Sequence, residues 1–150
     1  MKVIHFFEFS EDINVFQDEK DHFFIAMNPS AQARLKDLNL KYMSSIDFFN
    51  VEGHKSVLDK TNEIFNVIND LYYFKDENDV NVAYNKTFNF YLRLYVNYLL
   101  SLTFIIEQSI KTINPNKIYV TKHTSFEKFQ VPVSHQDRIV GYLVKKIIKN

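Results

Sequence analysis

Polar side chains that could hold a ligand follow an apolar run near the start of the chain. Asn28 and Ser30 come directly after the apolar run from His22 to Met27, and Gln32 follows within one helical turn. An Asn-Pro-Ser sequence between an apolar run and a helical pattern is typical of a strand-to-helix junction, because Asn and Ser cap helices and Pro suits the first turn. The backbone N–H groups at such a helix start attract phosphate, sulfate or carboxylate. Two interpretations stay open here, namely helix capping alone and a ligand site that includes Gln32.

Histidine is the second residue type that could do chemistry. His123 follows an apolar run and stands beside Lys122 and Thr124, which suits acid–base catalysis or contact with an anion. His54 lies at a predicted helix start and is the second candidate. The five histidines lack the close spacing of a metal site such as HxH or HExxH. No metal site is therefore predicted, and no catalytic residue is assigned.

The sequence lacks the motifs of several enzyme classes. It has no GxGxxG fingerprint, no phosphate-binding loop, no GxSxG motif and no cysteine. These absences remove the specific signals for dinucleotide binding, for serine hydrolases of the GxSxG type and for thiol catalysis. No cofactor is predicted.

Apolar runs short enough to be strands alternate with helical patterns along the chain. The expected strands are Lys2 to Phe9, His22 to Met27, Lys41 to Phe49 and Lys117 to Thr121. The expected helices are a short one from Ser10 to about Asp18, then Ala31 to Leu38, His54 to Phe74, Val82 to Ile113, and a last amphipathic helix capped by Ser134. This alternation implies a mainly parallel sheet covered on both faces. The predicted fold is α/β, a three-layer Rossmann-like domain with long helices that spans residues 1–150.

Such a sheet brings the strand ends together. Ligands bind outside the carboxyl ends of parallel strands, so these ends are where the candidate residues should meet. We expect one ligand-binding edge lined by Asn28, Ser30, Gln32, His54 and His123.

The longest helical pattern, from Val82 to Ile113, is apolar around most of its circumference. A helix of this kind is buried, membrane-embedded or part of an interface. Its uncharged stretch from Leu94 to Ile106 falls short of the roughly 18 to 20 residues of a membrane span. A core helix or a dimer helix is therefore predicted, with Leu99, Leu102 and Ile106 buried on one face.

Composition narrows the choice of partners. The chain has 150 residues, 18 basic and 18 acidic, and a formal net charge of 0. A chain without net positive charge has no overall electrostatic attraction to nucleic acid, so a nucleic-acid partner is not predicted. The N-terminus lacks the cleavage site of a signal peptide, which predicts a cytoplasmic protein.

Several phrases of the sequence carry a resemblance to a known family. They are NPSAQARLKDLNLKYMSSIDFF, INPNKIYVT and the ending GYLVKKIIK, together with the N-terminal strand and the long aromatic helices. The chain resembles the N-terminal half of a family of bacterial or archaeal surface-polysaccharide biosynthesis proteins, which is similar to two-domain glycosyltransferases of the GT-B type. The resemblance implies a Rossmann-like domain that faces a sugar or glycan acceptor. It also implies a second Rossmann-like domain that holds the nucleotide-sugar donor.

Two hypotheses of different classes follow from these observations. In the first, the chain is the acceptor-side domain of a glycosyltransferase-like protein in cell-surface polysaccharide biosynthesis and is not a complete enzyme alone. In the second, it is a non-catalytic α/β binding or assembly module that dimerises through its aromatic-rich helix, Phe88 to Ile106. Association with the periphery of a membrane also stays open. A third hypothesis, a small enzyme with His123 as general base, has the least support.

Overall fold

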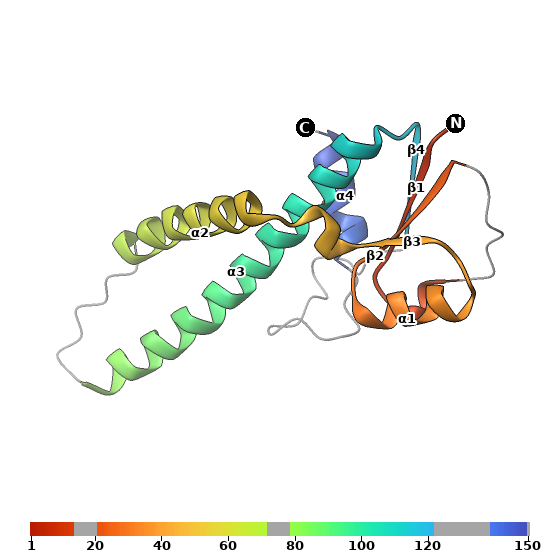
Figure 1. Ribbon diagram of the computed structural model, residues 1–150. Coiled ribbons are helices and arrows are strands. Elements are labelled where there is room, and N and C mark those ends of the chain that lie inside the picture. The colour runs from red at the N-terminus through yellow and green to blue at the C-terminus, as the bar shows by residue number, and fades with distance from the viewer. Residues whose placement is uncertain (14–20, 72–78, 122–138, 150) are drawn as a thin grey trace.

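The computed structural model describes residues 1–13, 21–71, 79–121 and 139–149 and places four parallel strands in one sheet of order β3-β2-β1-β4. The strands are β1 (Val3–Phe7), β2 (His22–Ala26), β3 (Tyr42–Ser44) and β4 (Lys117–Val120). The helices are α1 (Pro29–Asp37), α2 (Val51–Leu71), α3 (Asp79–Ile113) and α4 (Val140–Lys149), with two short 3-10 helices, η1 (Ser10–Asp12) and η2 (Ser45–Phe48). The α/β fold predicted from the sequence, with a parallel sheet and long helices, is confirmed (Figure 1).

The sheet separates two hydrophobic cores because strand side chains alternate between its faces. Ile4 and Phe6 join the core that contains the buried side chains of α3 and α4. Phe7 and Phe24 join the other core, together with Leu35 of α1. Helices therefore cover both faces, which is the three-layer arrangement expected of a Rossmann-like domain.

Helices α2 and α3 form an antiparallel hairpin that extends away from the sheet (Figure 1). The two helices approach closely near the base of the hairpin, where a Cβ atom on Gly53 would lie 2.6 Å from the Phe104 ring. Further along the hairpin, Arg93 lies over the Phe65 ring at 5.5 Å and donates to Asn62. The C-terminal half of α3 then packs on the sheet through buried Leu102 and Ile106.

Two sequence predictions about these elements are wrong in part. The predicted strand from Lys41 to Phe49 ends at Ser44, because the Ser44 hydroxyl accepts from the Ile46 N–H and the Asp47 carboxylate accepts from the Ser44 N–H, which starts η2 instead. The predicted burial of Leu99, Leu102 and Ile106 on one face of α3 holds for Leu102 and Ile106, whereas Leu99 is only half-buried. The N-terminal half of α3 exposes large apolar side chains.

The remaining predicted elements agree in type with the structure wherever the structure describes them. The predicted helix from Ser10 is only the single turn of η1 up to Asp12, and residues 14–20 lie outside the described part of the chain. The predicted cap at Ser134 also lies outside it. Within the described residues, no helix is long and apolar enough to cross a membrane.

Candidate functional site

The loops that follow β1, β2 and β3 meet at the carboxyl edge of the sheet. Parallel pairing in register brings Phe7 opposite Ala26 and Ala26 opposite Ser44. A backbone hydrogen bond also joins the ends of β1 and β2, because the Met27 N–H donates to the Phe7 carbonyl at 2.9 Å. Polar residues far apart in the sequence are therefore neighbours here, as the parallel sheet predicted.

Asn28 and Ser30 are joined in one hydrogen-bond network. The Asn28 side-chain oxygen accepts from the Ala31 N–H at 3.1 Å, which makes Asn28 the N-cap of α1. It also accepts from the Ser30 hydroxyl at 2.8 Å, and the Ser30 oxygen accepts from the Ser10 N–H at 3.3 Å. The network ties the loop after β1 to the start of α1, so both residues have a structural role at this edge.

Gln32 reaches from α1 to the next strand. Its side-chain amide donates to the Ser44 hydroxyl at 2.8 Å. Ser44 is itself held by Asp47, which accepts from the Ser44 N–H at 2.8 Å. Gln32 therefore fixes the end of β3 against α1, and its side chain is half-buried.

Glu8 is a buried carboxylate that the candidate set from the sequence does not contain. It stands directly after β1 and is only 6% exposed. Its two oxygens accept from the backbone N–H groups of Ile139 at 2.9 Å and Val140 at 3.2 Å. A carboxylate at a helix start is stabilised by unpaired N–H groups and by the helix dipole. Glu8 thus takes the place at α4 that a bound anion would occupy.

The charge of Glu8 acts on the hydroxyl of Tyr98 on α3. Burial of part of its side chain raises the pKa of the Tyr98 hydroxyl, and the charges of Glu8 and Tyr95 raise it further. A raised pKa keeps this phenol protonated at neutral pH. It can donate a hydrogen bond, but it cannot act as a base there.

The two histidine candidates do not join this network in the described residues. His54 is exposed near the start of α2, where its ring meets the Phe49 ring edge-on with centroids 4.3 Å apart. Phe49 in turn contacts Phe104 of α3, so His54 lies at the base of the hairpin. His123 lies outside the described residues, and its predicted convergence with Asn28 and Ser30 stays a prediction.

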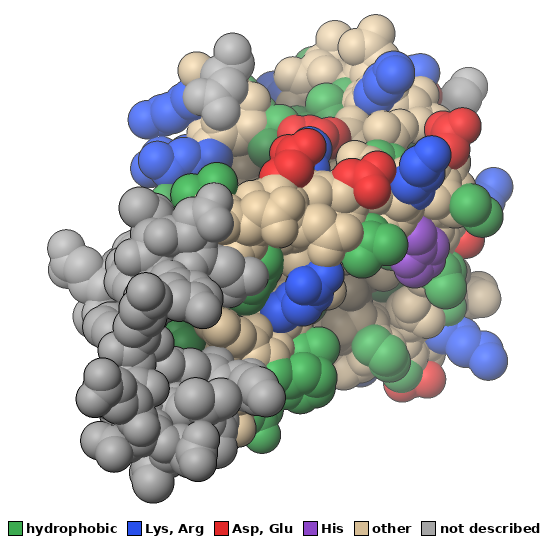
Figure 2. Space-filling model, turned by 90° about the vertical axis from the view of Figure 1, so that its left-hand side faces the viewer, with side chains coloured by type: hydrophobic (Ala, Val, Ile, Leu, Met, Phe, Trp, Pro, Cys, Tyr) green, Lys and Arg blue, Asp and Glu red, His purple; other side chains and the backbone are tan. Residues whose placement is uncertain are grey.

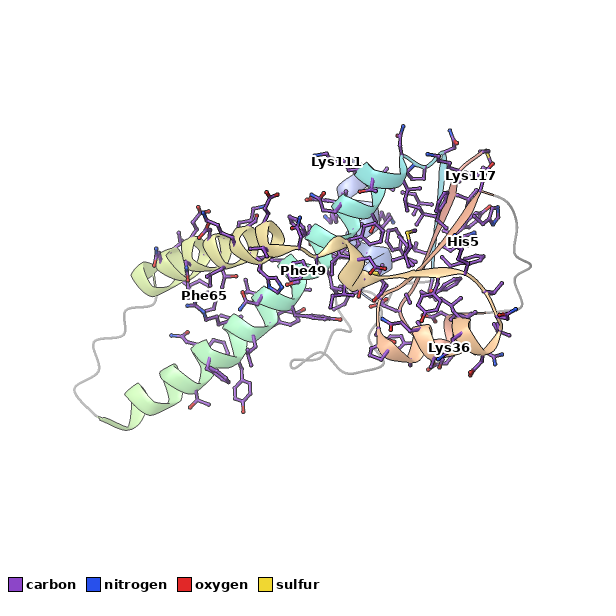
Figure 3. The ribbon with its side chains drawn as sticks, in the orientation of Figure 1. His5, Lys36, Phe49, Phe65, Lys111 and Lys117 are labelled. Atoms are coloured by element: carbon purple, nitrogen blue, oxygen red, sulfur yellow. The ribbon has the colours of Figure 1, made fainter. Side chains whose placement is uncertain are left out.

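A different histidine pair lies inside the sheet region. His5 is buried, and its Nε2 atom lies 3.1 Å from Nδ1 of His22 on the neighbouring strand. The His5 ring also stacks on Tyr119 with centroids 4.9 Å apart and tilts against Phe24 at 5.2 Å. In the register of β1 and β2, His22 pairs with Val3 and His5 with Phe24, so the two histidines are diagonal neighbours, and Figure 3 shows His5 within the sheet, away from the loops at the strand ends. His5 is buried and His22 is half-buried, so the pair packs within the sheet and not at the carboxyl edge.

The described residues supply little for catalysis or metal binding. They contain no group of three or more His, Cys, Asp or Glu side chains placed to hold a metal ion. An open hollow of about 410 Å³ lies on the outer surface of α2, lined by Glu52, Lys55, Ser56, Asp59, Lys60 and Glu63. All six belong to one helix, so this hollow does not extend to the carboxyl edge.

Comparison of the chain with protein-family models, with curated proteins and with solved structures finds no match. The conclusions on function therefore depend on the geometry of the chain itself.

Proposed function

We propose that this chain is a non-catalytic assembly module that forms a homodimer through the exposed half of α3. The observation that carries the proposal is a row of exposed large side chains on that helix, which we call the aromatic stripe and define as Phe90, Tyr91, Leu94 and Tyr98. Their exposed fractions are 59%, 60%, 51% and 45%. They share one face, because residues three and four apart are neighbours on a helix.

The aromatic stripe has the composition of an interface centre. It contains no charged side chain, and aromatic residues are enriched at protein interfaces whereas Lys, Glu and Asp are depleted. The largest apolar patch on a protein surface, typically about 300 to 600 Å², is often a functional one. Figure 2 shows charged and hydrophobic side chains together on this face of the molecule. The charged side chains on the outer surface of α2 include Glu52, Lys55, Asp59, Lys60 and Glu63, none of which belongs to the aromatic stripe.

A second copy of the chain suits this surface because the aromatic stripe is self-complementary. A two-fold dimer uses the same patch on both copies. If two α3 helices pair antiparallel about Leu94, Leu94 meets its own counterpart. Phe90 and Tyr98 stand four residues to either side of Leu94. Phe90 of one copy would therefore contact Tyr98 of the other. Neither contact places like charges together.

The area available predicts a reversible dimer. A large side chain presents about 150 to 250 Å², of which roughly half is exposed here, so the four residues offer about 400 Å² per copy. Two copies would bury about 800 Å² through these residues alone, and flanking polar side chains would bring the total near the 1,000 Å² expected of a weak but specific interface. We expect dimerisation at micromolar concentrations.

Leu94→Glu tests the dimer. The substitution places two carboxylates against each other at the centre of the proposed interface, which should raise the dissociation constant at least about 100-fold. Sedimentation equilibrium over a range of concentrations should show wild-type chain approaching twice the monomer mass and Leu94→Glu remaining monomeric.

Val51→Glu is the matched control for this test. Val51 is 82% exposed at the start of α2, outside the aromatic stripe, and the substitution adds the same charge. It should leave the dimer unchanged. A wild-type chain that stays monomeric at about 100 μM, far above the expected dissociation constant, would overturn the proposal.

The acceptor-side domain of a glycosyltransferase-like protein is the second candidate. It is supported by the meeting of Asn28, Ser30 and Gln32 at the carboxyl edge, which is where α/β sheets bind ligands. On this candidate the chain is cytoplasmic and binds a sugar or glycan acceptor. The nucleotide-sugar donor belongs to a second domain.

Calorimetry with a panel of nucleotide-sugars tests that candidate. Because the donor site lies mainly outside this chain, we expect no heat of binding or a dissociation constant weaker than about 1 mM. Micromolar binding would show that the chain holds its own donor site, and the acceptor-side assignment would then be wrong. Chemical-shift changes at Gln32 on addition of acceptor glycans, with none from nucleotide-sugars, would support it over the assembly module.

A further inference from the structure

The opposite edge of the sheet, where the strands begin, carries most of the lysines of α4, β4 and the end of α3. Helix α4 is held by Glu8 at the carboxyl edge and runs back along the sheet, so its last turn lies at the same end of the molecule as the first residues of β1 and β4 (Figure 1). Helix α3 ends at the same level. We call this surface the basic edge and define it by its exposed lysines, Lys2, Lys111, Lys117, Lys145, Lys146 and Lys149.

Among the residues that the structure describes, few acids balance these lysines. Between Glu107 and Thr121, and between Ile139 and Lys149, Glu107 is the only acidic residue. At the start of β2, Asp21 is paired with the Met1 amino group at 3.3 Å. The chain is neutral as a whole, but salt screens a charge beyond about 8 Å at physiological ionic strength. A five-residue strand separates the two edges by roughly 16 Å, so a partner at the basic edge meets mainly positive charge.

Helix stabilisation accounts for only part of this charge. Lys2 donates from Nζ to the carbonyl of Ile113 at 3.1 Å, which caps the end of α3, and Lys146 lies over the Tyr142 ring at 5.6 Å. Lys145 and Lys149 stand four residues apart on the outer face of α4. Lys149 lies in the last turn of α4, where a cation stabilises the helix dipole, and the side chains of Lys145 and Lys149 are both exposed to an anionic partner.

An exposed apolar side chain lies next to these lysines. Ile148 lies four residues from buried Val144 but is 61% exposed, which indicates that the last turn of α4 passes beyond the core. The rest of the apolar face of α4 packs in the core, so Ile148 is the apolar side chain that α4 presents to a partner, and clustered lysines are attracted to anionic lipid headgroups. Bidentate recognition of nucleic-acid phosphates and bases favours Arg, and none of the basic-edge cations is Arg, so the lipid surface is the partner that we test first.

We propose that the basic edge docks on the surface of an anionic lipid bilayer, with Ile148 entering the headgroup region. The hairpin descends from this edge in Figure 1, so the aromatic stripe stays accessible and the two proposals are independent. Each lysine near an anionic surface raises partitioning about fivefold.

Vesicle sedimentation of the full chain tests the proposal. In about 0.1 M salt, wild-type chain should sediment with vesicles that contain about 30% phosphatidylserine and should stay in solution with pure phosphatidylcholine. Lys145→Glu/Lys149→Glu should lower partitioning at least about 25-fold. Both lysines are exposed, so unchanged circular dichroism is expected for the variant.

Two further variants make the result specific. Lys55→Glu/Lys60→Glu makes the same charge change on exposed residues of α2 and should leave partitioning within about twofold of wild type. Ile148→Asn should lower partitioning several-fold with no change in charge. Equal binding to both kinds of vesicle, equal loss in the α2 control, or tighter retention by duplex DNA than by the anionic vesicles would each overturn the proposal.

Discussion

Leu102→Ala should lower the free energy of unfolding by about 2 to 5 kcal/mol. Leu102 is 6% exposed on α3, inside the core that α3 and α4 form with β1 and β2. Removing three carbons from a well-packed site loses their transfer free energy and leaves a cavity that the surrounding helices fill only in part. Urea denaturation followed by circular dichroism gives the change directly.

Leu58→Ala is the control for Leu102→Ala. The Leu58→Ala substitution removes the same atoms from a helix, but Leu58 is 51% exposed on α2. We therefore expect the free energy of unfolding to change by less than about 1 kcal/mol. If Leu102→Ala also costs less than that, this face of α3 is not part of the core. The prediction separates the two halves of α3, because only the C-terminal half packs on the sheet.

The parallel sheet could be predicted from the sequence because its signals are local. A short apolar run followed by Asn28-Pro29 marks both the end of β2 and the start of α1, and the structure has both within one or two residues of the expected positions. Alternation of strands and helices then leaves a parallel sheet as the simplest arrangement. Because parallel strands run in one direction, the sequence also predicts that the polar residues after them lie at one edge of the sheet.

The exposure of α3 could not be predicted because it depends on what packs around the helix. The sequence shows apolar residues on nearly every face, and periodicity alone does not say which face meets the sheet. Helix α2 packs along the middle of α3, with contacts from Arg93 to Phe104, and the sheet covers only the C-terminal half of α3. The aromatic stripe is what remains after both have packed.

The part of the candidate site that sequence reasoning missed is a long-range contact. Asn28, Ser30 and Gln32 were found from local capping signals, and their bonds are local or span one neighbouring strand. Glu8 was visible as a polar residue at a strand end, but its partners lie more than 130 residues away. No spacing rule connects residues so distant. The burial of Glu8 is what requires a partner for its charge, and that burial is known only from the structure.

Glu8→Gln should lower the free energy of unfolding by about 2 to 3 kcal/mol, because a charged acceptor of two buried backbone N–H groups becomes a neutral amide that can accept only through one atom. The amide NH₂ group would face the Ile139 or the Val140 N–H, and two donors cannot pair. The start of α4 should loosen first. Hydrogen exchange of the Ile139 and Val140 amides should therefore accelerate more than that of Ile25 in β2.

Glu11→Gln separates this anchoring role from a general effect of charge. Glu11 lies in the same loop and is exposed, so the same substitution there should change stability by less than about 0.5 kcal/mol and leave α4 protected. If Glu8→Gln unfolds like wild type and the α4 amides keep their protection, the carboxylate does not hold the helix. A loss confined to Glu8 would instead show that one buried acid fixes α4 across the sheet, and with it the position of the lysines at the basic edge.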